Sequence, residues 1–498
     1  MVDYTGLAEA MKAGNISTLS NGDVKIYKSS FSVNEKTQLV MIKEANIKYL
    51  IATGEGALYD ALEGSIEGNV KKCPTSHANR LVLNQYFDYT VPRAFGTEIA
   101  TIGLGDRLGI ASPGHIQTVR GHDIRPILAQ QSIRELALTG RDYKQVIDAS
   151  AFAVFQEGYK DGYGADGDHL KVEADIRMAL DLGFTMLTLD CSEKIDTTIE
   201  VATDAVLAEK YVLLPEAVRT HYENRYLDQS FQAAGTTISF DRPTLIKNVL
   251  IYSQAIDYMK HIYRSYIEHA SREIDFEISI DETSTPTAPE SHFFVAHELY
   301  EDGIKIYSMA PRFCGEFQKG IDYIGDIAQF ESELAIHAGL ADDFGYKLSI
   351  HSGSDKFSVF SLIGKYTKGR FHIKTAGTNW LEAVRTVAKV NPSLYRSMHS
   401  YALAHFEEAK AYYHVTTDIS KIVPLASVAD SDLADTYMNE DNARQLIHIT
   451  YGILLQAKDE QGKFLFRDVF YLTLSEQEEA FEQSLVSHIG KHLALLGK

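Results

Sequence analysis

The sequence has few of the features that mark secreted or nucleic-acid-binding proteins. Among its 498 residues are only three cysteines, Cys73, Cys191 and Cys314, which are far apart and match no zinc-binding spacing. Their small, odd number predicts a reducing compartment and no disulfide framework. The formal net charge of −20 disfavours a surface for nucleic acid, because phosphate contacts need clustered lysine and arginine.

Long hydrophobic runs are also missing. No apolar stretch reaches the ~20 residues that a membrane-spanning helix needs. Residues 1–15 do not combine a basic segment with an apolar core, so no signal peptide is predicted. We therefore predict a cytoplasmic protein with no membrane partner. The composition, 45% hydrophobic and 23% charged, is that of an ordinary globular chain, and it carries no information on oligomeric state.

Two groups of catalytic motifs are absent. No G-x-G-x-x-G or G-x-x-x-x-G-K-[ST] follows a strand-like run, and the group Gly103, Gly105 and Gly109 has the wrong spacing. The segment "HSGSD" at 351–355 is not the G-x-S-x-G of a serine hydrolase. These absences disfavour a nucleotide-binding fold and a serine hydrolase.

From residue 101 onward, short apolar runs alternate with helical segments, which is typical of parallel βα units. Helices are predicted over 141–159, 326–344 and 379–390, where apolar residues recur near i, i+3, i+4 and i+7. Eight strands are predicted, over 101–110, 125–131, 165–171, 184–190, 275–282, 304–313, 346–352 and 370–377. Eight strands with helical crossovers predict an α/β fold of the (β/α)8 TIM-barrel type.

The remaining segments divide the chain further. We predict a small N-terminal α/β region over 1–95, with strands over 24–33 and 38–54 and a helix over 56–64. The barrel is predicted over 96–390, with an insertion at 192–242. A C-terminal helical extension is predicted over 391–498, with helices over 393–413 and 442–458.

Three predicted strands carry polar residues at every second position. Because neighbouring side chains on a strand point to opposite faces, the polar sets should point into the barrel while the apolar sets pack against helices. The sets are Asp275, Glu277, Ser279 and Asp281 on the fifth strand, Lys347, Ser349 and His351 on the seventh, and Arg370, His372 and Lys374 on the eighth. Buried ionisable groups are costly unless they are paired or bind metal. The active site of such barrels lies at the C-terminal ends of the strands.

Histidines and carboxylates gather at those ends. His169, His351 and His372 fall near strand ends, Glu282 is the last residue of the fifth strand, and Glu316 lies just beyond the sixth. Histidine and carboxylate without cysteine suit a catalytic Zn, Mn, Ni or Co site. With 18 histidines in the chain, some would fall at strand ends by chance, so ordinary surface or hydrogen-bonded imidazoles are the alternative.

The segment "GADGDHLK" at 164–171 places Asp168 beside His169. Neighbours on a strand face opposite ways, but a bend at the strand end would bring both to one site. Asp168 could then act as a base or as a partner of the metal ligand. The alternative is a polar residue near the N-cap of the helix that starts near Val172.

Candidate substrate contacts lie at the same end of the barrel. Lys171, Arg312 and Lys374 could hold a substrate carboxylate. Gln130 and Gln131, at the end of the second strand, suit sugar hydroxyl groups. Ordinary surface salt bridges are the alternative for each cation.

Eight motifs in one order resemble the tagaturonate epimerase family. They are "GDRLGIASPGH", "AQQSIRE", "VFQEGYKDGYGADGDHLK", "FEISIDETSTPT", "RFCGEFQKGIDYIGD", "HSGSDKFSV", "HIKTAGTNWLEA" and "NARQLIHITYG". The resemblance covers about residues 96 to 455. Members of this family interconvert D-tagaturonate and D-fructuronate with a divalent metal in hexuronate catabolism. This chain departs from the family pattern at "ADGDH" and at Cys314, neither of which removes a needed chemical group.

The resemblance implies a metal-dependent epimerase with a small sugar-acid substrate. It implies these roles: Asp168 as proton acceptor, Glu277 as proton donor, and His169, His351 and a further residue as metal ligands. Glu316 is favoured for the last position over His372 and Glu282.

The two keto acids differ at a hydroxyl carbon β to the ketone, so enolisation alone cannot invert it. We predict cleavage and re-formation of the bond between the α and β carbons, with a metal stabilising the enediolate. Transient oxidation by a nicotinamide is the alternative, for which no dinucleotide motif is present. A metal-dependent aldolase or ketose isomerase acting on sugar acids is a second enzyme hypothesis. An inactive sugar-acid-binding protein is a third, and it predicts a missing base or ligand.

Overall fold

The computed structural model describes residues 4–16 and 24–498, and a closed barrel of eight parallel strands forms its centre. The strand order around the barrel is β12-β13-β14-β15-β6-β7-β8-β9. The bounds are β6 Thr101–Gly103, β7 Arg125–Ser132, β8 Gly164–Leu170, β9 Met186–Asp190, β12 Asp275–Ser279, β13 Ser308–Ala310, β14 Lys347–Ile350 and β15 Phe371–Lys374. Each predicted strand overlaps one of these, and the (β/α)8 prediction is confirmed.

Helices surround the barrel, and their limits follow from local sequence signals. Ser132 and Asp142 each cap a helix with a reciprocal capping box, and Gly140 and Gly158 end those helices in the left-handed conformation. The barrel helices are α4 Ser112–Val119, α5 Ile133–Thr139, α6 Tyr143–Glu157, α7 Glu173–Leu182, α11 Pro289–Glu301, α12 Ile327–Phe344, α13 Phe360–Tyr366 and α14 Thr378–Val390.

The N-terminal part is an antiparallel sheet of order β1-β2-β3-β5-β4. Its elements are α1 Thr5–Lys12, β1 Val24–Asn34, β2 Thr37–Glu44, β3 Ile47–Gly54, α2 Ala57–Ala61, β4 Ser65–Glu67, β5 Val70–Pro74 and α3 His77–Tyr86. The segment 38–54 forms two strands because Ala45 and Asn46 take φ values of 46° and 67°, which suits a tight hairpin turn. Residues 1–3 and 17–23 of the predicted 1–95 region lie outside the described residues.

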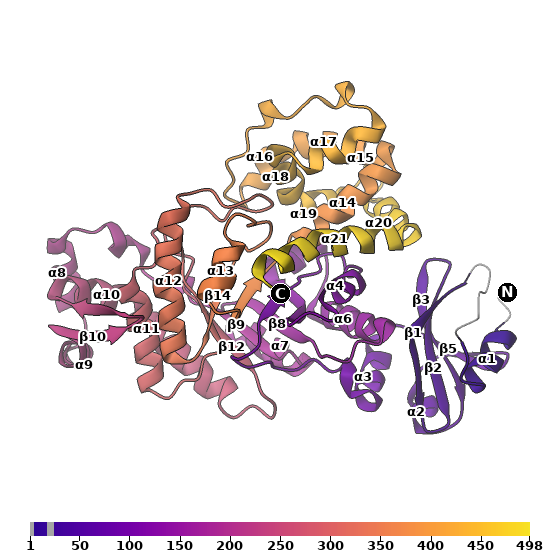
Figure 1. Ribbon diagram of the computed structural model, residues 1–498, viewed down its shortest axis with the longest axis horizontal. Coiled ribbons are helices and arrows are strands. Elements are labelled where there is room, and N and C mark those ends of the chain that lie inside the picture. The colour runs from indigo at the N-terminus through magenta and orange to yellow at the C-terminus, as the bar shows by residue number, and fades with distance from the viewer. Residues whose placement is uncertain (1–3, 17–23) are drawn as a thin grey trace.

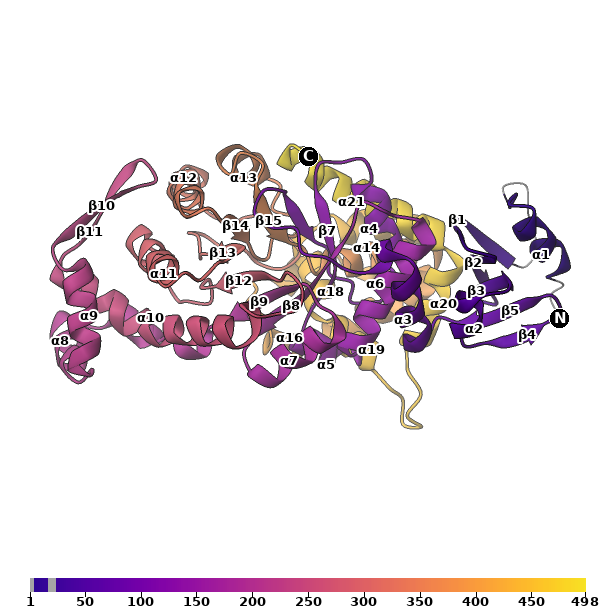
Figure 2. The same ribbon diagram turned by 90° about the horizontal axis from the view of Figure 1, so that it is seen from below.

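Between β9 and β12 the chain makes a long excursion. It contains α8 Asp204–Val212, α9 Glu216–Tyr226, the hairpin β10 Gln229–Ala233 and β11 Thr236–Phe240, and the long helix α10 Arg242–Ile262. Figures 1 and 2 show this segment at the end of the molecule opposite the N-terminal sheet. The barrel therefore lies between two additions.

The C-terminal helices lie against one side of the barrel, in orange to yellow in Figure 1. They are α15 Pro392–Ala404, α16 Phe406–Lys410, α17 Leu433–Met438, α18 Asp441–Ile449, α19 Tyr451–Gln456, α20 Arg467–Glu476 and α21 Glu478–Leu496. Helix α21 contacts α4, α13 and α14. No helix among the described residues is long and apolar enough to cross a membrane.

The first residue of α21 also connects this helix to the N-terminal sheet. The Glu478 carboxylate lies 3.1 Å from the Lys25 ammonium, 3.0 Å from that of Lys43 and 2.9 Å from that of Lys48, and it accepts a hydrogen bond from Tyr27. Three cations around one carboxylate hold the sheet to the end of the chain.

Candidate active site

A cavity of about 860 Å³ opens at the C-terminal ends of the barrel strands. Its wall includes the ends of β7, β8, β9, β14 and β15 and the loops that follow β12 and β13. Tyr412, Tyr413 and His414, which follow α16, complete it. This volume is typical of a pocket for a small-molecule ligand.

The end of β8 bends sharply at His169, whose φ of 56° lies in the left-handed region that non-glycine residues rarely adopt. The bend also breaks the regular pairing of β8 with β9 after Gly167. Asp168 and His169 both line the cavity as a result, and their side chains are 2.7 Å apart, from Oδ1 to Nδ1. A strained conformation at this position is typical of a functional site.

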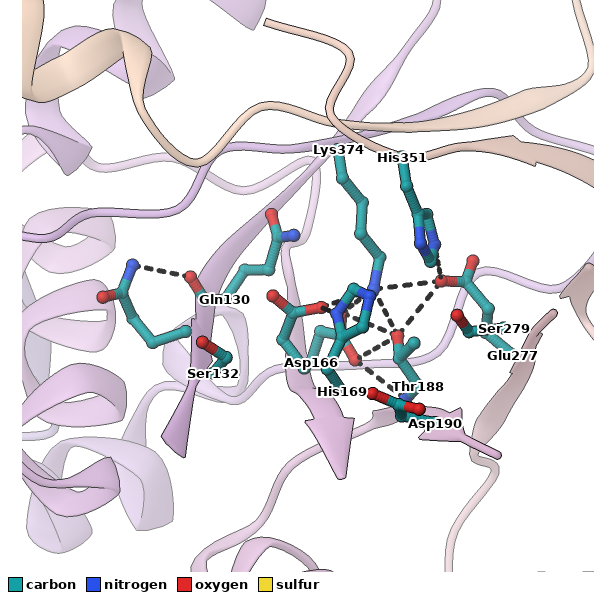
Figure 3. Close-up of polar contacts among 12 residues, drawn as sticks. Gln130, Ser132, Asp166, His169, Thr188, Asp190, Glu277, Ser279, His351 and Lys374 are labelled. Carbon is teal, nitrogen blue, oxygen red and sulfur yellow. Dashed lines mark hydrogen bonds and ion pairs between the residues drawn. The ribbon is translucent and has the colours of Figure 1, made fainter. Parts of the chain in front are cut away.

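Lys374 lies at the centre of a buried group of acids (Figure 3). Its Nζ is 2.9 Å from Asp166, 2.7 Å from Asp168 and 3.0 Å from Glu277, and it also contacts Thr188. Although burial opposes ionisation, this ammonium holds the pKa of Asp168 and of Glu277 well below the usual range. The Lys374 ammonium, which is predicted to contact a substrate carboxylate, is thus shared among three carboxylates of the protein itself.

Asp166 and Thr188 form the floor beneath these groups. Thr188 donates from its backbone nitrogen to Asp166 at 3.1 Å, and its hydroxyl reaches both Asp166 at 3.0 Å and Glu277 at 3.1 Å. Burial raises the pKa of Asp166 to about 6. Sequence reasoning assigned neither residue a role, although Asp166 shares the strand face of Asp168 by simple alternation.

Glu277 lies fully buried among several donors. Its Oε1 lies 2.8 Å from His351 Nε2, and its Oε2 accepts a hydrogen bond from Ser308 at 2.5 Å. The side chain therefore has a fixed position and is ionised in this arrangement. A role as proton donor requires that a proton reach it from these neighbours.

His169, Asp281 and His351 form a group that could hold a metal ion. One ligand atom from each lies within 4.8 Å of the other two. Although burial favours the neutral imidazole, the carboxylates of Asp281 and Glu277 raise the pKa of His351 to about 10. The group therefore attracts positive charge, and two imidazoles with a carboxylate suit a divalent transition metal.

The structure does not place Glu316 in this group. Its side chain is 42% exposed, its backbone pairs with Ile324, and its carboxylate lies 3.8 Å from His414. His372 lies deeper in the barrel, where Nδ1 is 2.8 Å from the hydroxyl of Thr101. Glu282 is exposed at the rim of the cavity. Asp281, which follows β12 directly on the predicted inward face, lies with the two histidines, while Glu316 lines the same cavity farther from them, and its role as a ligand stays a prediction.

The described residues hold a second group with metal-ligand spacing, formed by Asp355, His488 and His492. Its atoms already have partners. The Asp355 carboxylate pairs with Arg444 at 2.8 Å, and His492 Nε2 accepts a hydrogen bond from the Asp355 backbone nitrogen at 3.1 Å. This group connects α21 to the loop after β14.

Two of the predicted substrate contacts line the cavity with unsatisfied polar capacity. The buried Gln130 Oε1 has no hydrogen-bond partner among the described residues. Arg312 has no carboxylate within ion-pair distance in the described part of the chain, and its guanidinium donates to the Thr283 carbonyl. Lys171, by contrast, pairs with Asp190 at 3.4 Å and donates to Ser192 at 2.8 Å.

The predicted inward faces continue below the cavity. Lys347 is buried and donates to the Ile99 carbonyl at 2.7 Å and to the Tyr307 hydroxyl at 2.6 Å. Asp275 is buried and accepts from the backbone nitrogens of Phe95 and Gly96. The barrel interior is therefore polar along three strands.

Comparison with known proteins identifies a family for this chain. Residues 27–496 match the family described as tagaturonate epimerase. The tagaturonate/fructuronate epimerase of Thermotoga maritima is 40% identical over 478 residues, which cover 95% of this chain and 97% of the relative. Native and glycerol-complexed crystal structures of fructuronate-tagaturonate epimerase from Cohnella laeviribosi are 65% identical, cover 99% of both chains and have a TM-score of 0.94.

Proposed function

This chain belongs to the tagaturonate epimerase family and is an isomerase, and we propose that it interconverts D-tagaturonate and D-fructuronate in hexuronate catabolism. The observation that carries the proposal is the placement of a His169–Asp281–His351 group beside the acids around Lys374, in one cavity at the barrel mouth. The names of its relatives give the substrate pair.

His169, Asp281 and His351 would hold a divalent cation, and Glu316, on the wall of the same cavity, is the alternative to Asp281 as the third ligand. A cation bound there would supply Lewis-acid stabilisation of negative charge on substrate oxygens. The identity of the ion follows from availability as much as from the ligands, since Zn, Mn, Ni and Co all accept this set.

The carbon that changes configuration is β to the ketone, so its C–H bond is not acidified. We propose that Asp168 accepts the proton of the hydroxyl on that carbon. The O–H electrons then form an aldehyde as the bond between the α and β carbons breaks, and the electrons of that bond pass into the former ketone as an enediolate. After the aldehyde rotates, the bond forms again on its opposite face, and Glu277 donates a proton to the new alkoxide.

Lys374 connects the two acids that this scheme uses. Its Nζ lies 2.7 Å from Asp168 and 3.0 Å from Glu277. A proton accepted by Asp168 can therefore pass through the Lys374 ammonium to Glu277 without leaving the cavity. Gln130 Oε1, which has no hydrogen-bond partner among the described residues, would accept a hydrogen bond from a substrate hydroxyl, and Arg312 would contact substrate oxygens.

The direct test removes bound metal with a chelator, restores one metal, and follows D-fructuronate by proton NMR. Growth of tagaturonate signals only in the restored sample supports the proposal. Three-carbon products in place of an isomer of equal mass would indicate an aldolase. No change in either sample would refute the proposed activity.

A further inference from the structure

The positively charged side chains that line the cavity differ in whether an acid neutralises them. Lys374 has three carboxylates within 3.0 Å, and Lys171 has Asp190 at 3.4 Å. Within residues 4–16 and 24–498, no carboxylate lies within ion-pair distance of the other three, Arg134, Arg312 and Lys319. Three unneutralised cations around one cavity indicate an anionic ligand.

Lys319 is the most constrained of the three. It lies in the loop between β13 and α12, and its Nζ donates to the hydroxyl of Ser352 at 3.1 Å. The side chain is partly buried, and burial outweighs the more distant attraction of Glu135, which lowers the pKa of Lys319. A desolvated ammonium with one neutral partner is unfavourable, and an anion bound beside it would offset that cost.

The two arginines are less suited to this role. Arg134 is exposed in the first turn of α5, and its guanidinium lies 5.3 Å from the centre of the Tyr413 ring. Arg312 already donates to the carbonyl of Thr283. Lys319 is also connected to the proposed metal group, because its hydrogen-bond partner Ser352 directly follows His351 in the chain.

We propose that Lys319 binds the carboxylate of the substrate and thereby selects sugar acids over neutral ketohexoses. This inference rests on the proposed function, because it places one end of the same substrate, the carboxylate end farthest from the ketone, against Lys319. In these keto acids the carboxylate is separated by one carbon from the carbon that is inverted. The fragment that becomes an aldehyde therefore carries the carboxylate, and an anchor at Lys319 retains that fragment while its aldehyde rotates.

The test compares Lys319→Met with Lys319→Arg and with Lys365→Met, a control whose ammonium is 62% exposed on α13. Charge-assisted hydrogen bonds to buried groups predict that Lys319→Met raises KM for D-fructuronate roughly ten- to hundredfold. Lys319→Arg should stay within a few-fold of wild type, and Lys365→Met should not differ. The midpoint of thermal unfolding without ligand should be no lower in any variant than in wild type, because the desolvated Lys319 ammonium does not stabilise the unliganded protein.

A second measurement separates this inference from the proposed function. The rise in the thermal unfolding midpoint with saturating D-fructuronate measures binding, whether or not the substrate is turned over. If wild type binds but does not epimerise, and Lys319→Met loses the stabilisation, the carboxylate site stands and the proposed activity fails. Unchanged KM and unchanged stabilisation in Lys319→Met overturn the inference, as does an effect found only in Arg312→Met. Absence of any stabilisation in wild type overturns both.

Discussion

Replacing Lys374 by methionine should turn the floor of the cavity from a balanced cluster into an excess of negative charge. The ammonium is the shared partner of Asp166, Asp168 and Glu277, all of which are buried. Methionine retains much of the side-chain volume but leaves Asp166 without a counter-charge, and Asp168 and Glu277 keep only their ion-pair contacts with His169 and His351. Removing one partner of a buried ion pair costs about 3–5 kcal/mol.

Loss of the Lys374 ammonium should lower the unfolding midpoint by an amount that depends on pH. Unfolding entropy of about 2.1 cal/mol/K per residue gives roughly 1 kcal/mol/K for this chain, so the midpoint should fall by about 3–5 °C at pH 8. Lys374 holds the pKa of Asp168 and Glu277 below the usual range. Without it, burial and mutual repulsion raise these pKa values, and the carboxylates take up protons as pH falls. The loss of stability should therefore shrink toward pH 5.

Scanning calorimetry of chelator-treated protein between pH 5 and pH 8 measures this effect. Lys171→Met is the matched control, because its ammonium is 37% exposed and has a single carboxylate at 3.4 Å. A pair of that kind contributes about 0–1 kcal/mol, so the midpoint should move by about 1 °C or less. A Lys374→Met midpoint equal to that of wild type at pH 8, or a deficit that grows as pH falls, would refute the reasoning.

Three further predictions concern the metal group, a buried histidine and the N-terminal sheet. Asp281→Asn should lower the amount of divalent metal retained after reloading to less than half of the wild-type amount, measured by elemental analysis. Glu316→Gln should retain the wild-type amount. The reverse order would indicate Glu316, not Asp281, as the ligand. Burial lowers the pKa of His399 to about 4, so folding is opposed as pH falls below about 6.5, by about 2 kcal/mol at pH 5. His399→Phe should flatten the dependence of the unfolding midpoint on pH between 6.5 and 4, and parallel curves would contradict this. Glu478→Gln should cost about 1–3 kcal/mol and speed hydrogen exchange in β1–β3 at pH 7; unchanged exchange would show that the lysines around it are dispensable.

The barrel could be predicted from sequence because its strands are short apolar runs between amphipathic helices, and three of them alternate polar and apolar residues. The inward direction of Glu277, His351 and Lys374 follows from that alternation alone, and all three are buried in the barrel. A bend at the end of this strand, which would bring Asp168 and His169 to one site, is one of the two alternatives that the sequence leaves open. The positive φ of His169 shows that bend.

Other features depend on distances between strands, which a sequence does not contain. The sequence predicts Lys374 as a substrate contact, and it does not reveal the three acids from β8 and β12 that surround it. The choice between Asp281 and Glu316 depends on how far each loop reaches over the barrel, and motif spacing does not report that reach. No sequence pattern marked Lys319, because the argument for it is that no carboxylate in the described part of the chain lies within ion-pair distance of its ammonium.

The bonds around Glu478 join the last helix of the chain to strands formed by its first fifty residues. Residues Tyr412–His414, far beyond the last barrel strand, likewise complete the wall of the cavity. During synthesis, the strands of the N-terminal sheet leave the ribosome hundreds of residues before α21. The sheet therefore lacks its contacts with Glu478 until synthesis is nearly finished. A chain that stops at residue 390 could close the barrel, but it would lack part of the cavity wall and the ion pairs between Glu478 and the N-terminal sheet. Shortened or C-terminally fused forms should therefore be screened for folding yield before any loss of turnover is ascribed to chemistry.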